Sequence, residues 1–185
     1  DIKVGASDGT VTTTKDVAIS VTNINEGPVF TSATTASFAE TASGAAYTAA
    51  ATDPDAGAVL TYSISGADAA LFDIDPATGA VTFKSAPNYE APGDAGGNNV
   101  YDVNVTVSDG TNTATQAVAI SVTDTDEAPI FTSGTAASFA ENASGTVYTA
   151  AATDPDAGST ITYSIAGADA ALLNINATTR AIKFN

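Results

Sequence analysis

The sequence contains no cysteine, histidine, tryptophan or methionine. Without cysteine the chain forms neither a disulfide framework nor a thiolate metal site, and this absence is compatible with secretion. Without histidine or cysteine it also lacks the parts of a Ser-His-Asp triad, a Cys-His pair or an ordinary zinc site. We therefore expect a protein that is not an enzyme. A chain without methionine cannot begin at its own start codon, so we expect a processed product or a part of a longer polypeptide.

Basic residues are also scarce, with 5 Lys and Arg against 21 Asp and Glu and a formal net charge of −16. Nucleic acids and anionic membranes attract clustered basic side chains, so neither is an expected partner. No stretch reaches the roughly 18 apolar residues of a membrane-spanning helix, and no membrane insertion is expected. An acidic composition is also typical of a solubilising coat. Many of these acids recur at fixed positions, however, and this favours a cation as the ligand.

The chain repeats itself with a period of 101 residues. Residues 27–84 return as residues 128–185, with 38 identities in 58 aligned positions and no gap. Residues 1–26 fit the same period, since Ser7–Thr10 matches Ser108–Thr111. A period of this length corresponds to one domain per repeat. We therefore predict the C-terminal strands of a first repeat in residues 1–26, a complete repeat in residues 27–127 and the N-terminal part of a third repeat in residues 128–185.

The local pattern is that of β-strands throughout. Segments rich in Val, Ile, Thr and Tyr alternate polar and apolar residues, as half-buried strands do. Turn signals such as Asp53–Gly57 and Asp75–Gly79 separate them. In the complete repeat the predicted strands are Ala36–Ala39, Ala46–Thr52, Val59–Ile64, Leu71–Ile74, Ala80–Phe83, Tyr101–Val107 and Thr115–Val122. A short helical turn is a second possibility within Gly66–Leu71. About seven strands in about 100 residues predict an all-β, Greek-key β-sandwich of the immunoglobulin-like kind.

Motifs along the whole repeat resemble a cadherin-like domain of the kind that occurs in tandem in large bacterial surface adhesins. In the family's order, they are Ser37–Glu40, Asp53–Asp55, Leu60–Ile64, Phe72–Gly79, Pro87–Glu90, Asn99–Tyr101, Val107–Gly110 and Val122–Pro129. The resemblance implies extracellular domains that stand end to end, with neighbouring repeats as partners and calcium ions in the joints. Calcium takes about six to eight hard oxygen ligands from carboxylates, amides and backbone carbonyls.

The joint between the complete and the third repeat has the larger set of acids. By the resemblance, Glu40 and Glu90 come from the complete repeat, and Asn88 stands where the family has an aspartate and offers only a neutral oxygen. The linker and the third repeat add Asp124, Asp126, Glu127, Asp154 and Asp156. Carboxylates gathered in this way repel one another unless a cation lies between them. We therefore predict Ca²⁺ at this joint.

The earlier joint has fewer acids. By the same resemblance, its residues are Asn23, Asn25 and Glu26 from the linker and Asp53, Asp55 and Asp109 from the complete repeat. Two asparagines in place of two aspartates lower the local charge, so weaker calcium binding is expected here. Asp8 and Glu141 occupy motif positions whose partners lie outside the sequence.

Each acid has a simpler interpretation when it is taken alone. Asp53–Asp55 is a good turn by itself, and Asp109 with Gly110 is a common hairpin turn. Glu40 fits a solvated charge at the end of a strand. The calcium interpretation depends on the whole set of residues in the family's order.

The predicted function is a calcium-stiffened extracellular spacer or structural module of a bacterial adhesin-like or filamentous surface protein. A polysaccharide-binding module is the alternative, and an exposed aromatic strip across one sheet would favour it. Paired carboxylates also occur in glycoside hydrolases, but nothing in the sequence indicates a cleft. A further alternative is a fibre, since residues 128–185 and residues 1–26 supply complementary parts of one sandwich. Strand addition would then join further copies head to tail.

Overall fold

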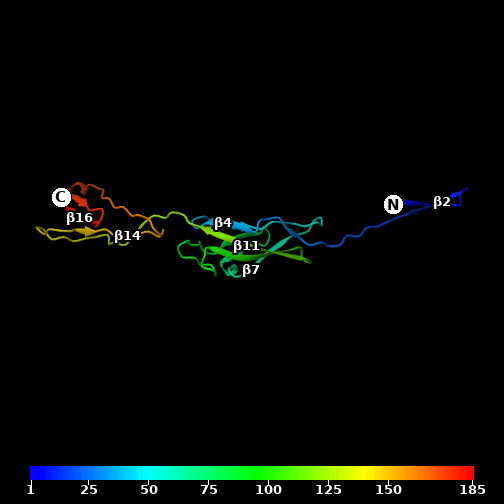
Figure 1. Cartoon of the computed structure of the whole chain (residues 1–185), viewed down its shortest axis with the longest axis horizontal. Coiled ribbons are helices and arrows are strands. Elements are labelled where there is room, and N and C mark those ends of the chain that lie inside the picture. The colour runs from blue at the N-terminus through cyan, green and yellow to red at the C-terminus, as the bar shows by residue number, and fades with distance from the viewer.

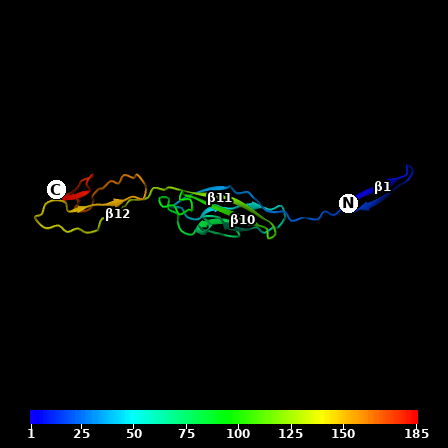
Figure 2. The same ribbon diagram turned by 60° about the horizontal axis from the view of Figure 1, so that its bottom comes forward.

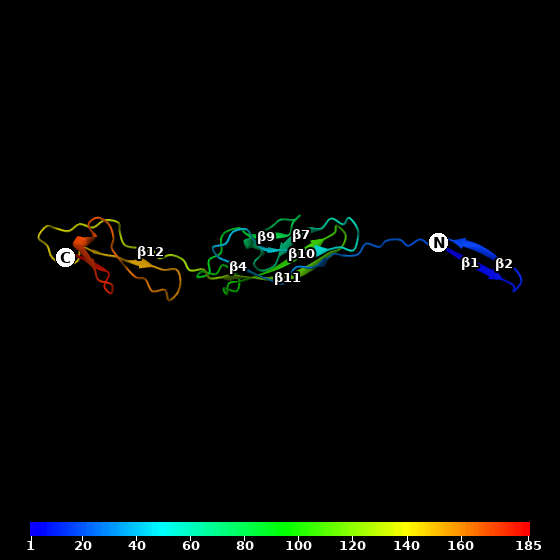
Figure 3. The ribbon, with the colours of Figure 1, turned by 90° about the horizontal axis from the view of Figure 1, so that it is seen from above.

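The computed structural model describes residues 1–185 and is an all-β structure with two short 3₁₀ turns. The molecule is long and thin, with its two termini at opposite ends (Figure 1). A hairpin lies at the N-terminal end, a sandwich in the middle and a second strand-containing part at the C-terminal end, and the turned views show the same row (Figures 2 and 3). The two 3₁₀ turns have three residues each, and the structure contains no membrane-spanning helix.

The middle part, here called the central sandwich, has one sheet of strand order β4-β11-β10-β7 and a second sheet of order β5-β9-β8. A short ladder of β3 with β6 adds to them, and β4 runs parallel to β11. The bounds are β3 (Val29–Phe30), β4 (Thr35–Ala39), β5 (Ala45–Thr48), β6 (Ala51–Thr52), β7 (Thr61–Ser65), the 3₁₀ turn η1 (Ala69–Leu71), β8 (Phe72–Ile74), β9 (Ala80–Phe83), β10 (Val100–Ser108) and β11 (Thr113–Thr123).

Alternation along the strands builds the core of this sandwich. On β10, Val103, Val105 and Val107 are buried, whereas Asp102 and Asn104, which alternate with them, are exposed. Successive side chains of a strand point to opposite faces, so one face packs inward and the other meets water.

An aromatic cluster closes the space between the two sheets. The ring centroids of Phe72 and Phe83 are 4.3 Å apart, and Tyr101 stands edge-on to Phe72 at 5.8 Å. Phe72 and Tyr101 are each only 2% exposed. The predicted all-β sandwich is confirmed.

The segment predicted as one strand over Ala46–Thr52 is divided into β5 and β6, which belong to different ladders. Between them the N–H of Ala49 donates to the carbonyl of Gly79, and the carbonyl of Ala50 accepts the N–H groups of Thr31 and Ser32. The chain therefore passes from the β5-β9-β8 sheet to the β3–β6 ladder at these two alanines. Periodicity gives no sign of such a crossing, since both halves are extended.

The flanking parts repeat pieces of the central sandwich. The hairpin of β1 (Ile2–Ser7) and β2 (Thr12–Val17) pairs Ser7 with Thr12, the register that Ser108 and Thr113 have in β10 and β11. The C-terminal part repeats the β3–β6 and β5-β9-β8 ladders 101 residues later. Its elements are β12 (Ile130–Phe131), β13 (Tyr148–Thr149), β14 (Ala152–Thr153), the 3₁₀ turn η2 (Ala170–Leu172), β15 (Leu173–Ile175) and β16 (Ala181–Phe184).

Residues 136–140 and 162–166 form no strand, although they are the counterparts of β4 and β7. In the central sandwich, β4 pairs with β11 and β7 pairs with β10. Residues 128–185 include no counterpart of that pair of strands, so these two segments lie outside any strand ladder.

Candidate metal centre

Four carboxylates lie close together at the end of the central sandwich where the linker to the C-terminal part begins. One oxygen from each of Glu40, Glu90, Asp124 and Glu127 lies within 4.8 Å of the others. We call these four residues the acidic cluster. Glu40 follows β4 directly, Glu90 lies in the loop between β9 and β10, and the other two follow β11. The cluster thus joins three separate parts of the chain.

The parallel pairing of β4 with β11 places Glu40 beside the outgoing linker. Ala39 is the partner of Thr123 in this ladder, and the N–H of Glu40 donates to the carbonyl of Thr123 at 3.2 Å. The Glu40 side chain is 5% exposed. Its carboxylate accepts the N–H of Tyr89 at 2.7 Å and the N–H of Thr125 at 3.0 Å. Glu40 therefore holds both the Glu90 loop and the linker in place.

The C-terminal part approaches the acidic cluster through one aspartate. The N–H of Glu127 donates to Oδ2 of Asp156 at 2.9 Å, and the N–H of Asp156 donates to Oδ1 of Asp154 at 3.1 Å. Oε2 of Glu127 and Oδ1 of Asp156 are withdrawn from water and have no hydrogen-bond partner. Buried oxygens of this kind usually have a partner, so both are available to a further ligand.

The electrostatics of the cluster are those of crowded acids. Loss of hydration, followed by the negative charges of Glu40, Asp156, Glu90 and Asp124, raises the pKa of Glu127 from 4.5 to about 7. Loss of hydration and the charges of Asp156 and Glu40 also raise the pKa of Asp124. The chain has two ion pairs, Lys3 with Asp16 and Lys84 with Asp73, and neither involves the cluster.

The donor set fits a hard cation. Every member of the cluster offers a carboxylate oxygen. Two buried oxygens at the joint have no hydrogen-bond partner, and no basic side chain offsets the negative charge. Carboxylate oxygens are the ligands that Ca²⁺ prefers. A divalent cation would favour the ionised form of each group and offset the repulsion among them.

Four of the residues predicted for this joint lie outside the acidic cluster, namely Asn88, Asp126, Asp154 and Asp156. Oδ1 of Asn88 accepts the N–H of Ala91 at 2.6 Å and so closes a local turn. The Asp126 side chain is exposed. Glu141, the counterpart of Glu40 in the C-terminal part, is also exposed.

At the earlier joint the predicted residues make hydrogen bonds to one another. The side-chain amides of Asn23 and Asn25 donate to the carboxylates of Asp55 and Asp109. The N–H of Glu26 donates to Oδ2 of Asp55 at 2.9 Å. Asp53 binds the N–H of Asp55 through Oδ1, and its buried Oδ2 has no partner.

Two of the predicted aspartates make tight turns through their own carboxylates. Asp8 accepts the N–H groups of Thr10 and Val11, and Asp109 accepts those of Thr111 and Asn112. These backbone donors hold the pKa of both carboxyls below the usual value. Asp8 lies in the turn between β1 and β2, and Figure 1 shows this hairpin at the opposite end of the molecule from the C-terminal part.

Sequence reasoning missed two buried carboxylates that shape the loop before β10. Asp68, 3% exposed, accepts the N–H groups of Ala95 and Asp102, both at 2.7 Å. Asp94, 7% exposed, accepts those of Asn98 and Asn99. Both aspartates have a structural role, and the loop that they fix also contains Glu90. The Asp-Ala-Gly-Gly-Asn-Asn run that begins at Asp94 was the available signal, because aspartate and glycine in that spacing are typical of such turns.

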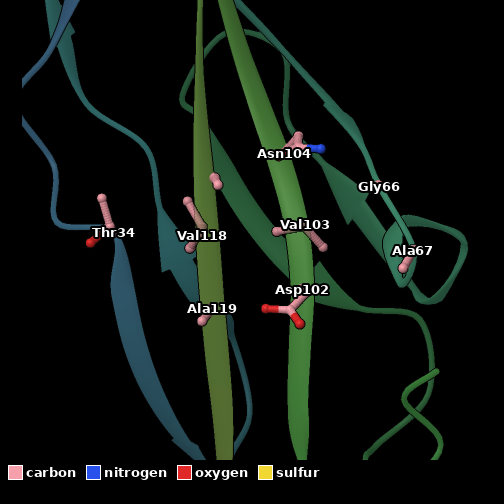
Figure 4. A pocket seen from close by; sticks show the side chains of 9 residues that line it. Thr34, Gly66, Ala67, Asp102, Val103, Asn104, Val118 and Ala119 are labelled. Atoms are coloured by element: carbon pink, nitrogen blue, oxygen red, sulfur yellow. The ribbon is translucent and has the colours of Figure 1, made fainter. Parts of the chain in front are cut away.

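A hollow over β10 and β11 lies on the outer face of the four-stranded sheet (Figure 4). Small side chains line it, and Asp102 supplies the only carboxylate. Its lining includes no aromatic residue and no member of the acidic cluster.

Comparisons with known proteins find the same fold. The chain matches no protein-family model and no curated protein. It is similar to human protocadherin-24 EC1-2 in two crystal structures. Form II has 27% identity and a TM-score of 0.57, covering 87% of this chain and 80% of that chain. The other has 29% identity and a TM-score of 0.54, covering 88% and 78%. Human CDH23 EC21-23 shares 24% identity with a TM-score of 0.56, covering 89% of this chain and 55% of that one. The fold is therefore cadherin-like, and the comparisons indicate no enzyme family.

Proposed function

We propose that this chain is a calcium-stiffened spacer of an extracellular, adhesin-like or filamentous surface protein of bacteria. A cadherin-like extracellular fold fits an adhesion or structural module. The observation that supports the calcium part is the acidic cluster, together with the buried oxygens of Glu127 and of Asp156 in the C-terminal part that have no hydrogen-bond partner. The repeat of 101 residues and the resemblance of its motifs support the surface-protein context.

In this proposal, the cluster residues Glu40, Glu90, Asp124 and Glu127 hold the ion together with Asp156. The ion supplies positive charge where the apo joint has only negative charge. Glu40 holds the linker on the central sandwich, and Asp156 binds the linker from the other side. A cation shared by these groups connects the central sandwich, the linker and the C-terminal part into one unit. Without it, carboxylate repulsion loosens the joint.

The test uses the polypeptide of residues 1–185 with calcium and with a chelator. Calcium is expected to give an extended scattering profile, slow proteolysis within residues 123–128 and a higher melting temperature. Its affinity is expected in the extracellular range, about 10⁻⁴–10⁻³ M. Glu127→Gln should weaken the calcium response, whereas the matched control Glu141→Gln should leave it unchanged. If the chelator alters none of the three measurements, the proposal is wrong.

The polysaccharide-binding alternative has less support. The strand aromatics Phe38, Tyr47, Tyr62 and Tyr101 are buried in the core. They form no exposed strip, and the hollow in Figure 4 has no aromatic lining. Retention of the chain on a glycan array, undiminished by Glu127→Gln, would favour this alternative over the calcium spacer.

Head-to-tail joining of copies is a second proposal, and one observation favours it. The β1–β2 hairpin has the register of β10–β11, while residues 136–140 and 162–166 have no strand partners. Around those segments Phe131 is 70% exposed and Phe184 is 57% exposed. Sedimentation of residues 1–185 over a hundredfold concentration range tests it. Growth in mass with concentration supports strand addition between copies, and a monomer at every concentration excludes it.

A further inference from the structure

The two linkers of this chain make the same backbone contact at matched positions. The N–H of Glu26 donates to Oδ2 of Asp55 at 2.9 Å, and 101 residues later the N–H of Glu127 donates to Oδ2 of Asp156 at 2.9 Å. Both aspartates also lie in the same kind of turn. In each turn the N–H of the aspartate donates to the carboxylate of the aspartate two residues earlier. The two joints therefore allow a direct comparison.

The joints differ at the other oxygen of that aspartate. At the first joint, Oδ1 of Asp55 accepts the side-chain amide of Asn23. At the second joint, Oδ1 of Asp156 is buried and has no partner. The residue that corresponds to Asn23 there is Asp124, which has no N–H to donate and whose own negative charge repels Asp156. The residue at this linker position, Asn23 or Asp124, thus determines whether the Oδ1 atom has a hydrogen-bond donor from the protein.

Two further side-chain amides hold the first linker. Asn25 donates to Oδ2 of Asp109 at 2.8 Å, and Asn112 donates to the carbonyls of Asn25 and Glu26 at 3.2 and 3.1 Å. Gly27 lets Asn112 approach, because a Cβ on this glycine would lie 3.3 Å from the Asn112 Cβ. The contacts join linker backbone, linker side chains and two turns of the central sandwich.

We infer that the first linker is docked on the central sandwich by amide–carboxylate hydrogen bonds that need no metal. Residues 23–26 therefore stay docked without calcium, whereas the calcium function proposed above makes the docking of residues 124–127 depend on the ion. Amide N–H donors at Asp55 and Asp109 also compete with any cation for the same oxygens, so calcium must displace them to bind there. The docking of the first linker does not require calcium at the second.

The Glu26 and Glu127 amides are matched probes for this inference. Their hydrogen exchange is measured residue by residue by NMR on the polypeptide of residues 1–185, first with a chelator and then with calcium. Glu26 is expected to be protected to within about twofold in both conditions, because protein groups alone satisfy Asp55. Glu127 protection should rise roughly 10- to 100-fold with calcium, the range for one hydrogen bond to a charged group. If Glu26 is unprotected in chelator and becomes protected only with calcium, the inference is overturned. If Glu26 is protected throughout and Glu127 never responds, the inference stands and the calcium function proposed above fails.

Exchanging the deciding residue gives a second test. Asn23→Asp should remove the protection of Glu26 in chelator by roughly 10- to 100-fold and make it depend on calcium. Asp124→Asn should in turn protect Glu127 in chelator. Asn104→Asp adds the same charge to an exposed position of β10 and should change neither amide. If Asn23→Asp affects Glu26 no more than Asn104→Asp does, the amide of Asn23 does not hold the linker and the inference is wrong.

Discussion

Replacing Glu40 by alanine is expected to destabilise the central sandwich by about 3 kcal/mol even when no metal is present. The side chain is 5% exposed, and its carboxylate accepts two backbone N–H groups, at 2.7 Å from Tyr89 and 3.0 Å from Thr125. Each hydrogen bond to a charged group contributes about 1.5–3 kcal/mol. The lower end applies because a displaced linker returns the Thr125 N–H to water. Loss of the charge also relieves repulsion from Glu90, Asp124 and Glu127.

The assay is urea unfolding in the presence of a chelator, which separates the structural role of Glu40 from any role as a ligand. The chain has no tryptophan, so the near-ultraviolet circular dichroism of the buried tyrosines reports the transition. Glu141→Ala is the matched control, since the same residue 101 positions later is exposed. Its expected effect is within about 0.5 kcal/mol. Equal losses for the two variants would refute the reasoning, because burial and hydrogen bonding would then not distinguish the two glutamates.

Three further predictions concern pH, backbone space and the core. Because the pKa of Glu127 is raised from 4.5 to about 7, the metal-free folded chain binds more protons than the unfolded one in this window. Without metal, the free energy of unfolding should therefore fall as pH rises from 4.5 to about 7. Calcium affinity should rise over the same range. If the free energy of unfolding of Glu127→Gln falls with pH to the same extent, the effect does not come from Glu127. Gly79→Ala should cost about 3 kcal/mol in urea unfolding, since φ is +71° and a Cβ would lie 2.5 Å from a carbonyl oxygen. Gly57→Ala, with φ +86° and no atom within 4 Å, should cost only about 1 kcal/mol. Phe72→Ala should lower the free energy of unfolding by about 3–5 kcal/mol, as measured by thermal melting. Leu173 is the half-buried counterpart of Phe72, and Leu173→Ala should lower it by less than about 1 kcal/mol.

The strand positions were largely predictable from the sequence. Predicted segments over Ala80–Phe83 and Tyr101–Val107 correspond to β9 and β10 within a residue at each end. The alternation of buried valines with exposed polar residues on β10 is a local property, so it can be seen in the sequence. The exceptions are the segment Ala46–Thr52, which is divided into β5 and β6, and the two-residue strand β3, which is too short to show any period.

The candidate site was predictable only as a list of acids. Sequence reasoning placed Asp126 and Glu127 in the same linker with equal weight. The structure brings Glu127 into the acidic cluster and leaves Asp126 exposed. The difference depends on the direction in which each side chain leaves an extended linker. That direction is set by the contacts of Glu127 with Asp156 and of Thr125 with Glu40.

The sequence by itself determined that this protein is built of β-strands, that its pattern recurs every 101 residues, and that acids recur at the ends of the repeat. These are properties of composition, spacing and alternation, which neighbouring residues encode. Only the tertiary structure decided that Glu40 meets a linker 85 positions away, and that Asn23 satisfies an aspartate whose counterpart is left without a partner. The parallel pairing of β4 with β11 brings Glu40 beside its linker, and the pairing of β3 with β6 brings the first linker beside Asp55. Such pairings depend on the register and packing of distant segments, and no local pattern specifies them.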